Sequence, residues 1–202
     1  STSSSCHNTV TAAMPNAKPL DLAGPLADLH SDALLLMPDA ISVQGDAVPM
    51  PFHELLVHRS DMTSTLSRFH GSAIQLQVLQ QTIEPTNILR AVILRRCRDN
   101  QPVEYGAIRI FLKHFPDDAA ETLRAGTTPL GTVLTDFNIP YISNPLGFFR
   151  MHTSIEIANS MELDSSGDVV YGRRNRHLTP SGDVLADILE ILPPVIPARN
   201  VD

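Results

Sequence analysis

The hydrophobic pattern of this chain changes its period near residue 74, and this change constrains the fold more than any other feature. Before it, apolar residues recur at helical spacing in 25–37, 52–58 and 60–71. After it, "AIQLQVLQ" (73–80) alternates apolar and polar residues, as a half-buried strand does. Helices are therefore expected first, and strands after them.

The rest of the chain is predicted to be mostly strands separated by short turns. "ILRAVILRRC" and "VEYGAIRIFL" are joined by the polar turn "RDNQP", which is typical of a hairpin. One helix is expected at 116–126, with acidic residues in its first turn and a glycine at its end. The expected strands are 73–80, 88–97, 103–112, 148–158, 168–178 and 183–192. This order predicts an α+β fold in which helices cover one face of an antiparallel sheet.

Length and composition indicate one domain, because 202 residues, 43% of them hydrophobic, suffice for a single sizeable core. We expect 1–24, rich in Ser, Thr, Ala and Pro, to be a flexible lead-in and 25–202 to form the domain. No apolar run reaches 18 residues and the start lacks a secretory pattern, so no membrane partner is expected. Cys6 and Cys97 do not make a disulfide framework, which favours a cytoplasmic protein.

The charge distribution argues against a nucleic-acid partner. The formal net charge is −7 and the sequence pI about 5.5, whereas binding to phosphates needs a basic surface. Arginine nevertheless clusters at 95–98 and 173–176. Two interpretations stay open: a genome that favours arginine codons, or one or two arginines that bind a carboxylate, for which the planar guanidinium is well shaped.

Searches for catalytic and metal motifs give little. "HELLVH" resembles a zinc-protease helix, but His53 and His58 are five residues apart and do not share a helix face. The chain has no phosphate loop, dinucleotide fingerprint or G-x-S-x-G. No metal and no cofactor are therefore expected.

Two charged residues stand on strand faces that are otherwise apolar. Glu190 shares a face with Ile188 and Leu192, and Arg90 shares one with Val92. An edge strand that is partly wet would explain Glu190, and a snorkelling side chain would explain Arg90. If both point inward, they predict a cavity for a small acid, in which Arg90 holds a carboxylate and Glu190 handles a proton or hydroxyl.

Five segments in order resemble the chorismate lyase family, the 4-hydroxybenzoate synthases. They are "DMTSTLSRFHG", "ILRAVIL", "TTPLGTVL", the "GRRNR" strand and a last strand whose glutamate precedes Leu-Pro, together spanning about 51–194. The resemblance implies a six-stranded antiparallel sheet with helices against it. It also implies a lyase that splits chorismate into 4-hydroxybenzoate and pyruvate without metal or coenzyme.

The resemblance also implies roles for single residues. Arg90 matches the arginine that binds the ring carboxylate, and Glu190 the glutamate near the 4-hydroxyl and the scissile ether, so these two would be catalytic. Met62 and Leu130 match positions whose backbone lies at the carboxylate end. Arg173 and Arg174 match the Gly-Arg-Arg pair and are candidates for binding the substrate, one of them through its second carboxylate.

Two other functions remain open. Departures such as "VEYGAIRI" and "NIPYISNPLGFFRM" suit an enzyme of secondary metabolism that acts on another cyclic or aromatic acid. Alternatively, effector domains of some transcription regulators resemble this fold, which would make the chain a domain that senses a small acid. Such regulators carry a basic winged helix ahead of this domain, and none is expected before Pro51. In each case the partner is a small carboxylic acid, and the chain is expected to be a monomer or homodimer.

Overall fold

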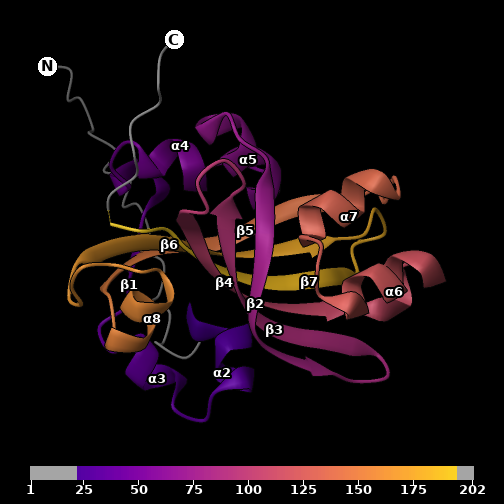
Figure 1. Ribbon diagram of the computed structural model, residues 1–202, viewed down its shortest axis with the longest axis horizontal. Helices are drawn as coiled ribbons and strands as arrows, with labels where there is room; N and C mark the ends of the chain where they lie inside the picture. Colours follow the sequence, from indigo (N-terminus) through magenta and orange to yellow (C-terminus); the bar gives the residue numbers. More distant parts are fainter. Residues whose placement is uncertain (1–21, 195–202) are drawn as a thin grey trace, which may run out of the picture.

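The structure, a computed structural model, describes residues 22–194 and contains one seven-stranded sheet (Figure 1). Its strands are β1 (Ile41–Val43), β2 (Ile74–Ile83), β3 (Asn87–Arg96), β4 (Pro102–Phe111), β5 (Ile142–His152), β6 (Val169–Leu178) and β7 (Val184–Ile191). The spatial order is β1-β5-β6-β7-β4-β3-β2, and every neighbouring pair is antiparallel. The predicted α+β class with an antiparallel sheet is confirmed. The predicted lead-in at 1–24 lies almost wholly outside the described residues.

Short helices surround the sheet. They are α2 (Pro25–Leu29), α3 (Ala33–Leu36), α4 (Phe52–Leu56), α5 (Met62–His70), α6 (Asp117–Ala125), α7 (Leu130–Asp136) and α8 (Ile155–Ser160), with 3₁₀ turns at Gly45–Ala47 and Leu112–His114. Helix α5 shows how local sequence sets these bounds. The Asp61 carboxylate accepts the Ser64 N–H at 2.8 Å and caps its start, and Gly71 ends it in a left-handed conformation with φ 57°.

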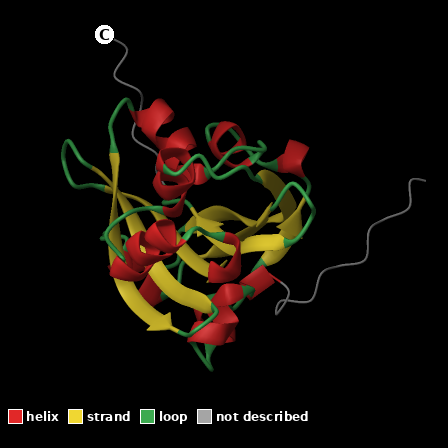
Figure 2. Ribbon diagram, turned by 90° about the vertical axis from the view of Figure 1, so that its right-hand side faces the viewer, coloured by secondary structure: helices red, strands yellow, loops and turns green. Residues whose placement is uncertain are grey.

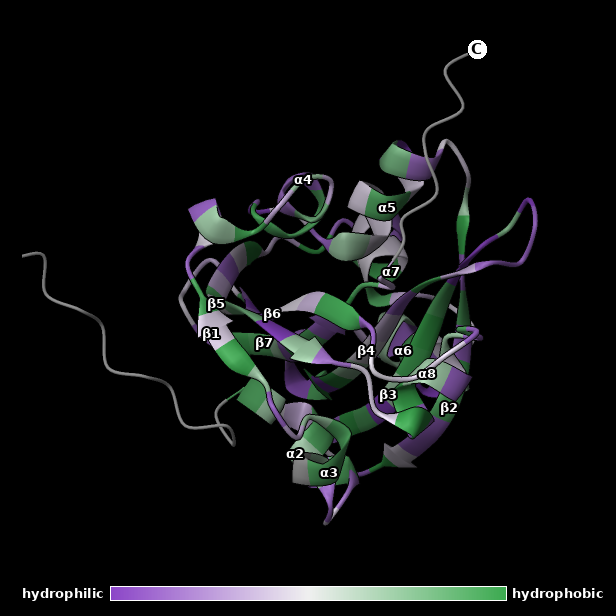
Figure 3. Ribbon diagram, turned by 90° about the vertical axis from the view of Figure 1, so that its left-hand side faces the viewer, coloured by the Kyte–Doolittle hydropathy of each residue, from purple (hydrophilic) through white to green (hydrophobic). Residues whose placement is uncertain are grey.

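Helices cover both faces of the curved sheet (Figure 2), so the prediction of helices on one face is wrong. Figures 1 and 3 show α4 and α5 on one side of the sheet and α2 and α3 on the other. Ala91 and Ile93 of β3 pack with α2, α3 and α8, whereas Ile88 and Leu94 of the same strand pack with the helices of the opposite face. Strand β3 is therefore buried on both sides, as its continuous apolar run would require.

Three further details differ from the sequence prediction. The sheet has seven strands rather than six because β1 pairs with β5 at the edge. The predicted strand 148–158 ends at His152, after which Ser154 caps α8 by accepting the Ile157 N–H. Helix α7 was not predicted, since seven residues give too little periodicity.

Within 22–194 no helix is long and apolar enough to cross a membrane. Cys97 is a free, exposed thiol, and Cys6 lies outside the described residues.

Candidate functional site

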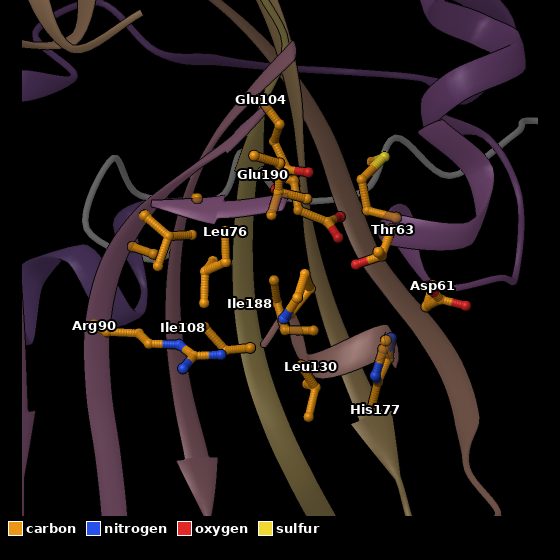
Figure 4. Close-up of a pocket in the computed structure, with 17 residues that line it drawn as sticks. Asp61, Thr63, Leu76, Arg90, Glu104, Ile108, Leu130, His177, Ile188 and Glu190 are labelled. Atoms are coloured by element: carbon orange, nitrogen blue, oxygen red, sulfur yellow. The ribbon is translucent and has the colours of Figure 1, made fainter. Parts of the chain in front are cut away.

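A cavity lies between the sheet and the first turns of α5 and α7 (Figure 4). It contains about 470 Å³ of empty space, part of which opens to solvent. Its walls are mostly apolar and come from β2, β3, β4, β6, β7 and the two helix starts. The apolar and glycine residues among them are Met62, Leu76, Val92, Leu94, Gly106, Ala107, Ile108, Pro129, Leu130, Gly131 and Ile188. This lining is typical of a small-molecule site.

The floor of the cavity follows from the register of three strands. Val92, Gly106 and Glu190 form one row across β3, β4 and β7, and Arg90 with Ile108 begins the next row. Gly106 leaves the floor open, because a Cβ atom there would come within 3.1 Å of the Glu104 carboxyl and 3.2 Å of Val92. The alternation that predicted inward positions for Arg90 and Glu190 is thus confirmed, since both side chains line this cavity.

Arg90 is buried, with 1% of its surface exposed, yet it is poorly satisfied. Its guanidinium donates to the carbonyls of Leu123 and Thr128 at 3.4 and 3.5 Å, which is long for a hydrogen bond, and its Nε has no partner. Among the described residues no carboxylate pairs with it. Burial lowers the pKa of Arg90 to about 10, so the group stays charged near neutral pH. The structure therefore holds an uncompensated buried cation beside a cavity.

Glu190 does have a partner, and it is Arg173 rather than Arg90. The Arg173 Nε donates to one carboxylate oxygen of Glu190, and a second guanidinium nitrogen lies 3.4 Å from the other oxygen. The same guanidinium also donates to the carbonyls of Leu56, His58 and Ser60 at 3.1–3.2 Å. Arg173 thus fixes the segment between α4 and α5 to the sheet and is fully used in doing so.

The remaining predicted residues divide between the cavity and other places. Met62 and Leu130 line the cavity, each as the first residue of a helix. Arg173 lies behind Glu190 and does not line it. Arg174 points to the other face of the sheet, where it pairs with Asp187 and donates to the Ile188 carbonyl at 3.2 Å.

Sequence reasoning missed Glu104, one of three carboxyl groups in the cavity lining, with Asp61 and Glu190. It is 4% exposed, and its Oε2 has no hydrogen-bond partner. Burial raises the pKa of Glu104 well above its usual value, and the neighbouring Glu190 charge adds to this rise. The strand pattern could have identified it, because Glu104 shares a strand face with Gly106 and Ile108. A carboxyl group on an otherwise apolar face is the same pattern that identified Glu190.

His177 and Asp61 complete the polar lining on the side away from Arg90 (Figure 4). Both ring nitrogens of His177 are buried without a partner, and burial lowers its pKa to about 4, so the ring is neutral. Its ring packs against Tyr141, with centroids 4.6 Å apart. Asp61 is satisfied, since it caps α5 and accepts the Tyr141 hydroxyl at 3.0 Å.

Comparison with known proteins gives structural neighbours and no sequence relative. No protein-family model matches the chain. No curated protein matches it either. PhnF from Mycobacterium smegmatis aligns with a TM-score of 0.52 and 9% identity over 87% of this chain and 85% of its own. The product of gene SA0254 from Staphylococcus aureus aligns with a TM-score of 0.50 and 10% identity over 68% of this chain and 90% of its own. The ligand-binding domain of a GntR-family transcriptional regulator from Bordetella bronchiseptica has a TM-score of 0.47 and 14% identity over 59% and 85%.

These findings correct the functional prediction. PhnF and the SA0254 product, with TM-scores of 0.52 and 0.50, share the fold of this chain, and no sequence match supports the chorismate lyase family. The predicted chorismate pyruvate-lyase is therefore contradicted. One physical observation accompanies this correction: Glu190, the residue expected to handle a proton or hydroxyl, is ion-paired with Arg173 inside the core.

Proposed function

We propose that this chain is a ligand-binding domain that senses a small carboxylic acid. The observation that carries the proposal is the Arg90 guanidinium, which is buried beside a cavity and has no carboxylate partner among residues 22–194. Removing a charge from water is costly, and a ligand carboxylate would compensate that cost with charge-assisted hydrogen bonds. The similar structures described as effector or ligand-binding domains support a sensing role.

The cavity suits an acid with a compact apolar body. Ile108 and Ile188 form the floor beside Arg90, and Met62 and Leu130 form the roof. The planar guanidinium favours a bidentate carboxylate, and the apolar walls favour a ring or short hydrocarbon. Because the roof consists of the starts of α5 and α7, a bound acid would join these helices to the sheet, which is the kind of change a sensor can transmit.

The test is binding of benzoate, a ring-sized acid, measured by isothermal titration calorimetry on the wild-type chain. The decisive variant is Arg90→Met, which keeps the apolar stem and removes the charge. We expect it to lower benzoate affinity by about tenfold or more, because hydrogen bonds to charged groups are the strong ones. The matched control is Arg98→Met, whose side chain is 40% exposed and lies outside the cavity.

Two outcomes would overturn the proposal. One is that neither benzoate nor acids of similar size bind the wild-type chain. The other is that benzoate binds Arg90→Met and wild type equally well.

A further inference from the structure

The two ends of the cavity carry ionisable groups of opposite kind, an arginine at one end and carboxyl groups at the other. Figure 4 shows Arg90 at one end, and Glu104 with Glu190 at the other. Arg90 lies opposite Ile108, and Glu104 lies four residues from Ile108 along β4 on the same face. Four strand residues span roughly 13 Å of backbone, and both side chains reach into the space between. A ligand with one ring between two polar groups fits such a separation.

Of the three carboxyl groups at this end of the cavity, two have partners within the protein and Glu104 has none among the described residues. Glu190 is paired with Arg173, and Asp61 is used by the Ser64 N–H and the Tyr141 hydroxyl. Glu104 is buried, and within the described part of the chain it has no such partner and its Oε2 accepts no hydrogen bond. At the other end Arg90 is the only buried arginine of the cavity lining, and it has no carboxylate partner within the described residues.

We propose that the ligand is a zwitterion, with a carboxylate that binds Arg90 and a protonated amine, about one ring away, that binds Glu104. This inference rests on the proposed function and specifies its ligand class. A zwitterion would give each unpartnered group an opposite charge, while a simple acid would satisfy Arg90 alone. The residues between the two ends, Gly106, Ile108 and Leu76, are apolar or bare and would contact the body of the ligand.

A ligand amine and a ligand hydroxyl group would have different effects on the protonation of Glu104. Glu104 faces Glu190, Asp61 and the Arg173 guanidinium, and burial raises its pKa, which favours the protonated form in the empty cavity. A ligand ammonium favours the carboxylate form, so Glu104 would release its proton to solvent on binding. A hydroxyl group would hydrogen-bond to the protonated carboxyl group without that release.

The experiment uses three benzoates of equal length that differ at one atom: 4-(aminomethyl)benzoate, 4-(hydroxymethyl)benzoate and 4-ethylbenzoate. Calorimetry near pH 7 in two buffers of different ionisation enthalpy gives both affinity and protons released. We expect the amine to bind about tenfold more tightly than the ethyl compound and to release protons that the ethyl compound does not release. The Glu104→Gln variant should lose that preference and the proton release while it still binds 4-ethylbenzoate, which shows that the variant is folded. The exposed Glu121→Gln is the matched control.

The outcomes separate this inference from the proposed function. If all three benzoates bind equally, or if Glu104→Gln keeps the preference for the amine, the zwitterion is wrong and the acid sensor stands. If the hydroxymethyl compound binds best and releases no proton, the zwitterion is likewise wrong. If no benzoate binds, both proposals are wrong.

Discussion

Two arginines on the same face of the sheet, Arg173 on β6 and Arg90 on β3, are equally buried but differ in what surrounds them. Arg173 is 0% exposed, pairs with Glu190 and donates to the carbonyls of Leu56, His58 and Ser60. Arg90 is 1% exposed and has two long hydrogen bonds to carbonyl groups. Burial alone therefore does not distinguish the two arginines. They differ in how many of their guanidinium N–H groups donate a hydrogen bond within the protein.

The difference also distinguishes two regions near the cavity: the polar groups around Arg173 have partners within the protein, whereas Arg90 is poorly hydrogen-bonded. Around Arg173 the protein supplies every partner, so the segment between α4 and α5 is fixed before any ligand arrives. Around Arg90 the carbonyls of Leu123 and Thr128 are too distant for strong bonds. A buried polar group without a full set of partners calls for an explanation, and under the proposed function a bound ligand would supply the missing partner of Arg90.

The largest effect is expected for Arg173→Leu. It leaves the Glu190 carboxylate buried without a cation and leaves the carbonyls that Arg173 bonds without a donor. Breaking a buried pair from one side costs about 3–5 kcal/mol. Urea denaturation followed by circular dichroism should show this loss in the free energy of unfolding.

The double variant Arg173→Leu with Glu190→Leu is the control for that result. Because it removes both charges, it should regain a large part of the lost stability. If Arg173→Leu unfolds at the wild-type urea concentration, the pair is not structural and the comparison with Arg90 fails.

Arg90→Met should behave in the opposite way in the free protein. Removing an unpartnered buried charge and keeping an apolar side chain is expected to change the free energy of unfolding by less than about 1 kcal/mol, or to stabilise the fold. The same urea titration measures it. A loss comparable to that of Arg173→Leu would show that the two long bonds to Leu123 and Thr128 do hold Arg90 as a structural residue.

A pH titration tests the other unsatisfied group, Glu104. Its pKa is raised in the folded chain, while in the unfolded chain it lies near its usual value of 4.5. Above pH 4.5 the unfolded state ionises first, so this group lowers stability as pH rises toward its folded pKa. Glu104→Gln does not titrate, so its melting temperature should rise relative to that of wild type as the pH increases from 4.5 toward the folded pKa of Glu104.

The difference between the two proteins isolates Glu104 from the histidines. His58, His70 and His177 have pKa values lowered to about 4, so they lower stability as pH falls below their usual 6.5. That acid slope is common to both proteins and cancels in the difference. A melting-temperature gap that stays constant with pH would mean that Glu104 is ionised in the fold.

Part of the cavity lining can be predicted from the sequence, because strand alternation places Arg90 and Glu190 on inward faces whatever the details of the fold. It could not reveal that Glu190 belongs to Arg173, since that pair depends on the register of β6 and β7 across the turn between them. Alternation also places Glu104 on the inward face, but the sequence analysis did not identify it as an ionisable group of the cavity beside Arg90 and Glu190. Element existence was predicted well for long strands, whereas β1, with three residues, is defined only by its pairing with β5.

The smallest effect is expected for Arg176→Ala, two positions after Arg174 on β6. Its side chain is 41% exposed and lies 3.6 Å from Asp187, which remains paired with Arg174 in the variant. Ion pairs of this kind contribute about 0–1 kcal/mol, and salt weakens them further. Urea denaturation at low and high salt should therefore show a small loss that shrinks with salt. A loss above about 2 kcal/mol in the free energy of unfolding would mean that the three residues Arg174, Asp187 and Arg176 stabilise the fold as one network. The number of partners of an arginine would then predict its contribution to stability at the surface as well as in the core.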